Sequence, residues 1–123
     1  MNEININTLI GKTLQSINGA GKYSDEITFI VNDKEQFKMY HSQDCCEGVL
    51  VEDISGDIND LINTPILQAE ESTNNTDNLG REDLDDSHTW TFYRLTTIKG
   101  QVVIRWLGES NGYYSESISF VKL

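Results

Sequence analysis

The chain has 123 residues, of which 37% are hydrophobic, so it can bury the core of one globular domain and not of two. Its 20 acidic and 9 basic side chains give a net charge of −11, which opposes binding to nucleic-acid phosphates and to anionic membrane surfaces. No apolar run approaches the roughly 20 residues of a membrane helix. The N-terminal residues MNEININTLI also lack the positive start and apolar stretch of a signal peptide, so we expect a cytoplasmic protein.

Short strands joined by turns are expected in the first half of the chain. Residues 4–17 predict a turn or short helix that leads into a first strand, and the glycines, Asn and Asp of residues 16–25 predict a turn. β-Branched and aromatic residues predict a strand over 26–31, and the alternation of polar and apolar residues over 35–41 predicts its hairpin partner. Residues 49–54 predict a further strand.

The middle of the chain predicts one short helix and one polar loop. Residues 55–63 are typical of a short helix, which Ser55 or Asp57 would cap. Residues 65–71 follow as an extended segment. Residues 73–87 hold many acids and almost no apolar side chains, which predicts a solvated, mobile acidic loop. Their spacing lacks the alternation and closing Glu of a calcium loop, so no metal site is expected there.

The last third of the chain has the strongest strand signal. Residues 88–98, 101–108 and 113–123 predict strands that are separated by glycine-containing turns. About seven strand-like segments with short connections favour antiparallel pairing. We therefore predict a single domain over residues 1–123 with an α+β fold, built mainly on an antiparallel β-sheet with one or two short helices.

Cys45 and Cys46 are adjacent, and they are the two cysteines of the chain. Neighbouring cysteines rarely pair, because the bridge strains the peptide between them, so we interpret them as two small side chains in or near the core. Two cysteines and two histidines at unrelated spacings form no zinc signature, and we expect neither a metal nor a cofactor. A cysteine nucleophile activated by His41 or His88 would need a proximity that the sequence does not show, and we predict no catalytic residue.

Arg94 and Arg105 lie inside strands that are rich in aromatic residues. Each is either a solvated residue of an outer face or a fixed fork for phosphate or carboxylate. A three-residue loop ending at Gly100, with this glycine in the left-handed conformation, would pair Tyr93 with Arg105 and place both on a polar face. A two-residue loop Lys99-Gly100 would instead oppose the two arginines, which is unfavourable unless an anion lies between them.

The preferred three-residue loop also predicts which side chains of the hairpin face the core: Trp90, Phe92, Val102, Ile104 and Trp106. Tyrosine and tryptophan rings can stack on a ligand and still offer a polar atom. Together with arginines and serine hydroxyls, residues such as Tyr113 and Tyr114 would suit a nucleotide-derived ligand, which presents π-faces, ribose hydroxyls and phosphates. The same composition is also typical of an ordinary β core with aromatic strands.

Three blocks of the sequence, residues 38–48, 51–72 and 90–117, resemble a family of small phage and prophage proteins, the first-described type of anti-Thoeris sponge. The strings HSQDCC and IRWLGESNGYYSE are the most specific parts of the resemblance. It implies a counter-defence protein in the cytoplasm of the infected bacterial host. Such a protein binds a cyclic ADP-ribose isomer, the signal that a TIR-domain enzyme makes from NAD in Thoeris immunity, and does not cleave it.

The resemblance also implies partners and one site residue. Members of the family are homo-oligomers, from a dimer up to a hexamer, with signal pockets near protomer contacts, and some hold cyclic oligonucleotides at a separate site. Arg105 matches a position expected to contact the phosphates of the ligand. We further predict that Arg94 assists it and that an aromatic ring stacks on the base, the candidates being Trp90, Tyr93, Tyr113 and Tyr114.

Two other classes of function remain open at this point. A small enzyme that degrades the same cyclic signal would need a general base or a metal, and the sequence clusters no histidines. An interaction protein that mimics nucleic acid and blocks a basic partner fits the charge of −11. Its acidic residues, however, do not follow one regular element.

Overall fold

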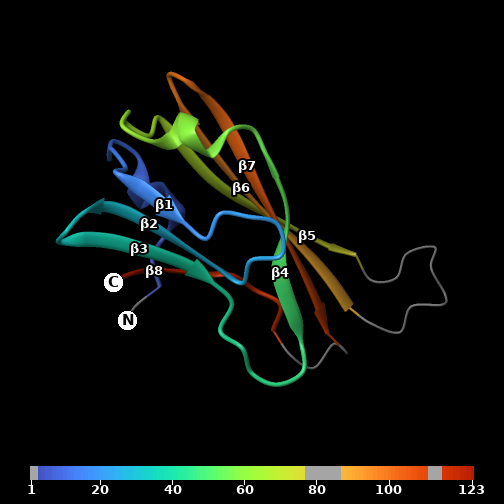
Figure 1. Ribbon diagram of the computed structural model, residues 1–123. Coiled ribbons are helices and arrows are strands. Elements are labelled where there is room, and N and C mark those ends of the chain that lie inside the picture. Colours follow the sequence, from blue (N-terminus) through green and yellow to red (C-terminus); the bar gives the residue numbers. More distant parts are fainter. Residues whose placement is uncertain (1–2, 77–86, 111–114) are drawn as a thin grey trace.

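Two four-stranded antiparallel sheets make up the fold in the computed structural model, which describes every residue except 1–2, 77–86 and 111–114 (Figure 1). The first sheet has the strand order β1-β2-β3-β8. Its strands are β1 (Ser16–Asn18), β2 (Glu26–Asn32), β3 (Glu35–Tyr40) and β8 (Ser119–Lys122). The hairpin predicted from residues 26–31 and 35–41 is confirmed, and it forms the centre of this sheet.

The second sheet has the strand order β4-β7-β6-β5. Its strands are β4 (Gly48–Ser55), β5 (Gln68–Thr76), β6 (Ser87–Thr97) and β7 (Gly100–Ser110). Two 3-10 turns, η1 (Ile6–Leu9) and η2 (Ile58–Leu61), are the helical segments of the described chain. Asp57 caps η2, because its side chain accepts a hydrogen bond from the N–H of Asn59 at 2.9 Å. The predicted fold, a mainly antiparallel sheet structure with one or two short helices, is confirmed.

One hydrophobic core lies between the two sheets. The first sheet contributes Phe37 and Met39 to it, and the second contributes Leu95 and Ile104. Trp106 of β7 is fully buried, and its Nε1–H donates to Met39 Sδ of β3 at 3.2 Å. This contact joins the centres of the two sheets. In the part of the chain that is described, no helix has the length and apolar character needed to cross a membrane.

The β6–β7 hairpin has a shorter loop than the sequence predicts. Thr97 pairs with Gly100, so the loop consists of Ile98 and Lys99, and the predicted three-residue loop is wrong. Gly100 is not among the glycines with a positive φ. A Cβ atom at this position would lie only 2.6 Å from Asp60 Oδ2. The geometry of the turn therefore does not call for a glycine here, and a larger residue would require the carboxylate of Asp60 on η2 to turn aside.

The shorter loop exchanges the two predicted faces of β6, because a shift of one residue turns every side chain of a strand to the other face. The buried side chains of this strand are Thr91, Tyr93, Leu95 and Thr97. Trp90 and Phe92 lie on the outer face with Arg94, so their predicted core positions are wrong. On β7 the predicted core residues Val102, Ile104 and Trp106 are all buried.

Two predicted segments have different bounds in the structure. Residues 73–76 of the predicted acidic loop belong to β5, and residue 87 begins β6. The rest of that loop, residues 77–86, lies outside the described residues. At the C-terminus, the strand predicted over 113–123 is confirmed only for β8, since residues 115–118 have no strand structure.

Candidate anion-binding site

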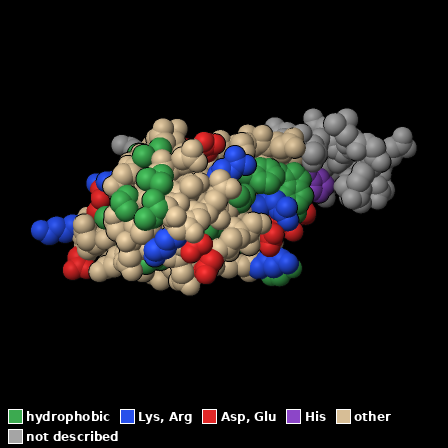
Figure 2. All heavy atoms as spheres, turned by 90° about the horizontal axis from the view of Figure 1, so that it is seen from above, with side chains coloured by type: hydrophobic (Ala, Val, Ile, Leu, Met, Phe, Trp, Pro, Cys, Tyr) green, Lys and Arg blue, Asp and Glu red, His purple; other side chains and the backbone are tan. Residues whose placement is uncertain are grey.

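The outer face of the second sheet carries both arginines that the sequence singles out. Arg94 on β6 pairs with Val103 on β7, and Phe92 pairs with Arg105. The two arginines are therefore diagonal neighbours, a relation that separates side-chain origins by about 7–8 Å in an antiparallel sheet. The view from above in Figure 2 shows hydrophobic side chains next to Lys or Arg side chains at the surface, beside a histidine.

Arg105 is held along one edge of its guanidinium group by carboxylates of β4. Its Nε donates to Glu52 Oε2 at 2.5 Å, and its Nη2 forms an ion pair with the same oxygen. Asp53 Oδ2 lies 3.8 Å from Nη2. Both acids reach Arg105 because the pairing of β4 with β7 shifts register between Val51 and Asp53. Within the described chain, no hydrogen bond or ion pair of Arg105 uses its Nη1 atom.

Trp90 supports the flat face of the same guanidinium group. The guanidinium carbon lies 5.4 Å from the centroid of the indole ring, within the range of about 6 Å for a cation–π contact. Glu52 binds one edge of the guanidinium group, and Trp90 packs against one of its faces. The position of the guanidinium group is therefore set before any ligand binds. The Arg105 side chain is still 38% exposed, and an anion in solution can reach its remaining edge.

Arg94 lines a hollow of about 350 Å³ on the same sheet face. The hollow is formed with Phe92, Val103, Glu70, Glu71 and Ser72. Arg94 Nη1 lies 3.9 Å from Glu70 Oε2, and its side chain is 54% exposed. Such an exposed ion pair is weak, so the guanidinium group of Arg94 can turn toward a ligand at small cost.

The charged groups of the site do not add up to a positive pocket. Arg94 and Arg105 face Glu52, Asp53 and Glu70, so the formal balance is 2 − 3 = −1. An anion has to bind the open edge of Arg105 or displace a carboxylate from it. Arginine can form bidentate, charge-assisted hydrogen bonds with phosphate, and these are the interactions that would hold an anion against the negative balance of the site.

Tyr93 does not lie beside Arg105, and its predicted place on the polar face is wrong. The side chain is only 1% exposed and packs in the core. Its hydroxyl donates to Glu71 Oε1 at 3.2 Å, and burial raises the pKa of the phenol. Tyr113 and Tyr114 lie outside the described residues. Of the predicted ligand residues, the structure brings together Arg105 and Trp90, with Arg94 diagonal to them.

The sequence did not point to Phe92 or Glu52 as neighbours of Arg105. Both faces of β6 carry aromatic residues, so the alternation of apolar side chains could not decide which of them faces outward. Glu52 had one weak signal, since it interrupts the otherwise apolar stretch of β4 that begins at Val49. An acid in such a stretch either faces solvent or pairs with a cation on a neighbouring strand.

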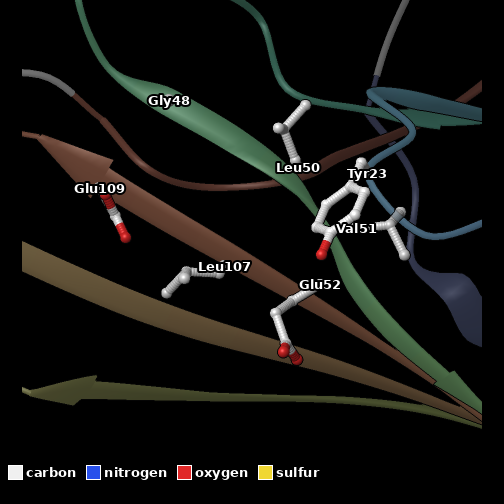
Figure 3. A pocket seen from close by; sticks show the side chains of 7 residues that line it. All are labelled: Tyr23, Gly48, Leu50, Val51, Glu52, Leu107 and Glu109. Carbon is white, nitrogen blue, oxygen red and sulfur yellow. The ribbon is translucent and has the colours of Figure 1, made fainter.

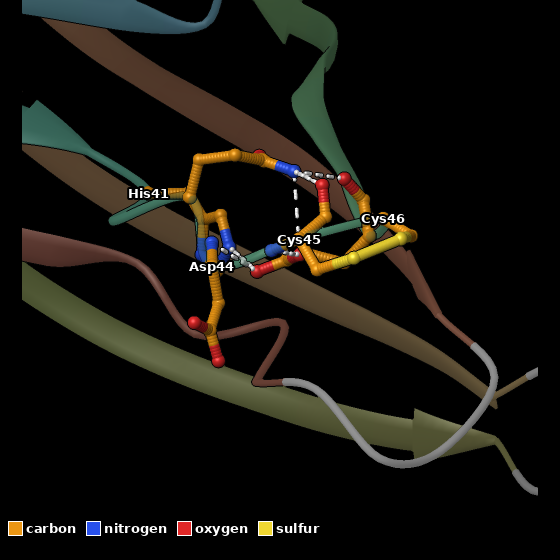
Figure 4. Close-up of a disulfide and its surroundings, with 6 residues drawn as sticks. His41, Asp44, Cys45 and Cys46 are labelled. Atoms are coloured by element: carbon orange, nitrogen blue, oxygen red, sulfur yellow. Dashed lines mark hydrogen bonds and ion pairs between the residues drawn. A yellow bond between two sulfur atoms is a disulfide. The ribbon is translucent and has the colours of Figure 1, made fainter.

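The two cysteines differ from their predicted role. Cys45 and Cys46 form a disulfide with each other, and both are exposed (Figure 4). The buried side chain of this loop is Glu47, whose carboxylate accepts hydrogen bonds from the N–H groups of Asp44 at 2.9 Å and Cys45 at 2.8 Å. The loop therefore wraps around a carboxylate and leaves the cysteine side chains outside, so their predicted position in or near the core is wrong.

His41 ties this loop to the chain that leads into β8. Its Nε2 lies 2.8 Å from Glu47 Oε2, and its Nδ1 lies 2.6 Å from the carbonyl oxygen of Ser117. Both partners are hydrogen-bond acceptors, so a doubly protonated ring satisfies both. The hydrogen bond from His41, with those from the backbone of Cys45 and Asp44, lowers the pKa of Glu47 to about 2 against the effect of burial.

The depressed pKa of Glu47 predicts a specific loss of stability in acid. Stability from this group is fully present above its ordinary pKa of 4.5 and is lost as the pH falls toward about 2. We expect the difference in unfolding free energy between the parent and Glu47→Gln to be largest above pH 4.5 and to shrink over this window. Urea denaturation of both proteins at a series of pH values measures it. A difference that stays constant with pH would contradict the prediction.

The described residues define a β-protein of two packed sheets with an arginine–tryptophan pair on an open sheet face. The chain belongs to the family described as "Domain of unknown function (DUF7448)", which matches residues 7–120. The match begins in η1 and reaches into β8, so it includes both sheets. No curated protein and no solved structure matches the chain.

Proposed function

We propose that this protein binds and sequesters a cyclic ADP-ribose isomer without cleaving it, and thereby blocks Thoeris immunity in the cytoplasm of a phage-infected bacterium. The observation that supports this function best is the arrangement of Arg105. Its guanidinium group contacts Glu52 and Trp90, belongs to a side chain that is 38% exposed, and lies on a sheet face with the partly exposed aromatic rings of Trp90 and Phe92.

The chemistry of the ligand matches the groups on this face. A cyclic ADP-ribose isomer presents a pyrophosphate, ribose hydroxyls and the π-face of a purine. Arg105 binds one phosphate through its open edge, and Arg94 approaches the second from its diagonal position. The indole ring of Trp90 is next to Arg105 and can stack on the base while it supports the guanidinium group.

The negative net charge affects the rate of binding more than the affinity. A chain of charge −11 repels an anionic ligand at long range and slows their association. Affinity depends on the short-range hydrogen bonds to phosphate, which this repulsion does not remove. A sponge needs slow release and a high protein concentration more than fast capture, so the charge is compatible with sequestration.

The test of this function separates binding from degradation. The protein is incubated with a purified cyclic ADP-ribose isomer, freed of unbound ligand by filtration, and then heat-denatured. We expect the intact isomer to be released, as identified by mass spectrometry, and Arg105→Ala treated in parallel to release far less. An altered product would show instead a small enzyme that degrades the signal. If the protein retains none of the isomers tested, the result favours an interaction protein whose acidic surface mimics nucleic acid.

We also predict that the protein is a homo-oligomer, at least a dimer. The strands β1, β4, β5 and β8 are edges of their sheets, and side chains such as Phe92 and Trp90 leave apolar surface on the outer face of the second sheet. Multi-angle light scattering at micromolar concentration should give at least twice the 13.9 kDa of one chain. A mass of one chain that does not rise with concentration would contradict the prediction.

A further inference from the structure

A second hollow lies on the outer face of the second sheet, where the turn before β2 crosses β4 (Figure 3). Its volume is about 220 Å³, and its lining consists of Tyr23, Gly48, Leu50, Val51, Glu52, Leu107 and Glu109. Neither Arg94 nor Trp90 lines it, and it shares only Glu52 with the anion-binding site. The proposed function does not use this hollow, so its chemistry can be considered independently.

The floor of the hollow is apolar and is open because of a glycine. Leu50 of β4 pairs directly with Leu107 of β7, and Leu50 is 41% exposed. The next residue pair on the same face of the sheet is Gly48 with Glu109. A Cβ atom added to Gly48 would meet no other atom within 4 Å. The missing side chain leaves a gap beside two leucines in a strand whose backbone does not require glycine, since the φ of Gly48 is not positive.

Tyr23 forms one wall of the hollow and is held there by its backbone. Its N–H donates to the carbonyl of Val51 at 2.7 Å, and the N–H of Val51 donates to the carbonyl of Ser24 at 2.8 Å. Tyr23 has a φ of 70°, a left-handed conformation that costs free energy for any residue with a Cβ. The side chain is nevertheless 68% exposed, so this conformation presents the ring to solvent instead of burying it.

The rim of the hollow favours a positive charge. Glu52 and Glu109 lie at its two ends, on either side of the Leu50–Leu107 pair (Figure 3). Glu52 is already paired with Arg105, whereas Glu109 is 53% exposed and has a histidine nitrogen, Nε2 of His88, at 3.8 Å. Glu109 is therefore the carboxylate that can accept a new cation.

The Tyr23 ring already lies within cation–π distance of one cation of the chain. The ammonium group of Lys22 lies 5.7 Å from the centroid of that ring. A group that fits the hollow thus combines an aliphatic stem, which packs on Leu50 and Leu107, with a positive end that reaches Glu109. Lysine and arginine side chains have this structure.

We propose that this hollow is a docking site for a lysine or arginine side chain of a basic partner protein. The net charge of −11 attracts such a partner at long range, and the hollow then receives one anchoring side chain. Arginine is among the residues that commonly anchor protein interfaces in pockets, and lysine and arginine both bury an apolar stem while they keep the charged end at the surface. The proposal stands whether or not the sheet face binds a cyclic nucleotide.

Methyl NMR of the leucine side chains tests the chemistry of the hollow. The probes are n-butylammonium, n-butylguanidinium, n-butanol and n-pentanoate, which share a butyl stem and differ in the charge of their polar end. We expect the methyl signals of Leu50 and Leu107 to shift with millimolar concentrations of the two cations, less with the alcohol and not with the acid. Equal shifts with n-butanol and n-butylammonium would overturn the proposal, because the hollow would then be an apolar groove without charge selection.

A peptide pair distinguishes a protein partner from a free amine. A short neutral peptide with one central lysine is compared with the same peptide carrying acetyl-lysine. We expect the lysine peptide to bind at least tenfold more tightly than n-butylammonium, and the acetylated peptide to bind at least tenfold more weakly than its parent. If the free amine binds as tightly as the peptide, the site is one for small amines and the partner proposal is wrong.

Two variants locate the binding. Gly48→Val fills the gap in open space with a residue that suits a strand, so it should keep the fold and abolish the shifts at Leu107. Tyr23→Gly removes the ring and relieves the positive φ, so it should weaken peptide binding without loss of stability. Ile98→Ala, at an apolar residue that is 78% exposed in the β6–β7 loop, is the control and should bind like the parent.

Two results with these variants would overturn the proposal. One is peptide binding by folded Gly48→Val that equals that of the parent. The other is a change in oligomer mass caused by Gly48→Val, because it would show that a second copy of the chain, and not a basic partner, lies on the hollow. Circular dichroism of each variant confirms that the comparison is made between folded proteins.

Discussion

Arg105→Ala should weaken binding of the cyclic ADP-ribose signal by roughly tenfold to a hundredfold or more, which corresponds to the loss of a charge-assisted hydrogen bond of about 1.5–3 kcal/mol. The guanidinium group of Arg105 is positioned by Glu52 and Trp90, whereas the more exposed Arg94 has only a long ion pair with Glu70 and is not held in the same place. Isothermal titration calorimetry with the parent and the variant measures the effect. Stability should change little, because Arg105 and Glu52 are 38% and 31% exposed.

Two further variants test whether the geometry of the guanidinium group matters. Arg105→Lys should recover only part of the affinity, since a lysine offers a point charge and not a planar fork. Lys38→Ala is a matched control, because Lys38 also pairs with a carboxylate, Glu26 at 3.2 Å, but lies on the first sheet. It should bind the signal like the parent. If folded Arg105→Ala binds as tightly as the parent, the site assigned to Arg105 is wrong.

Trp106→Ala should destabilise the fold by about 3–5 kcal/mol, the usual cost of deleting a large buried aromatic side chain. Trp106 is fully buried, and its indole N–H reaches Met39 across the two sheets. The loss is a large fraction of the roughly 5–15 kcal/mol that a domain of this size typically has. Urea denaturation followed by circular dichroism measures the change in unfolding free energy.

Trp106→Phe separates packing from the hydrogen bond of the indole. It keeps an aromatic ring in the core and loses the contact of Nε1 with Met39 Sδ, so its loss of stability should be clearly smaller than that of Trp106→Ala. A Trp106→Ala protein within about 1 kcal/mol of the parent would be inconsistent with a core that holds the two sheets together.

Arg105 and Trp106 are neighbours in β7 and should have opposite phenotypes. Successive side chains of a strand point to opposite faces, so Arg105 lies on the open face and Trp106 in the core. Removing Arg105 should reduce binding with little effect on stability. Removing Trp106 should reduce stability, while the fraction that remains folded keeps its affinity. Because one variant should lose binding and the other stability, each serves as the control that the loss in the other is specific.

The local elements could be predicted well from the sequence. The β2–β3 hairpin follows from β-branched and aromatic residues on both sides of a short polar turn. The cap of the segment that forms η2 was predicted to be Ser55 or Asp57, and it is Asp57, because capping depends on one side chain and the adjacent backbone. Arg105 stood out because a cation inside an aromatic strand needs either solvent or a partner.

The site could be predicted only in part, because its geometry depends on register. The sequence offered both Trp90 and Tyr93 as stacking residues but placed Tyr93 beside Arg105 and Trp90 in the core, and the length of one loop reverses this placement. The sequence suggested that Gly100 is needed for a left-handed turn conformation, which it does not adopt. Its close neighbour is Asp60, a tertiary contact that the sequence does not reveal. Glu52 reaches Arg105 across 53 residues of chain, a pairing that no local pattern indicates.

The sequence by itself determined most of the strand segments, the antiparallel class of the fold and the large negative charge, because these depend on composition and on patterns within a few residues. Only the tertiary structure decided how the strands divide into two sheets, since both sheets pair strands distant in the chain. It also decided that Glu47, and not the cysteines, is buried in its loop. A buried carboxylate needs hydrogen-bond donors, and one of those of Glu47 is His41, whose ring is itself held by the carbonyl oxygen of Ser117, 76 residues further along the chain. The sequence around Glu47 does not contain that contact.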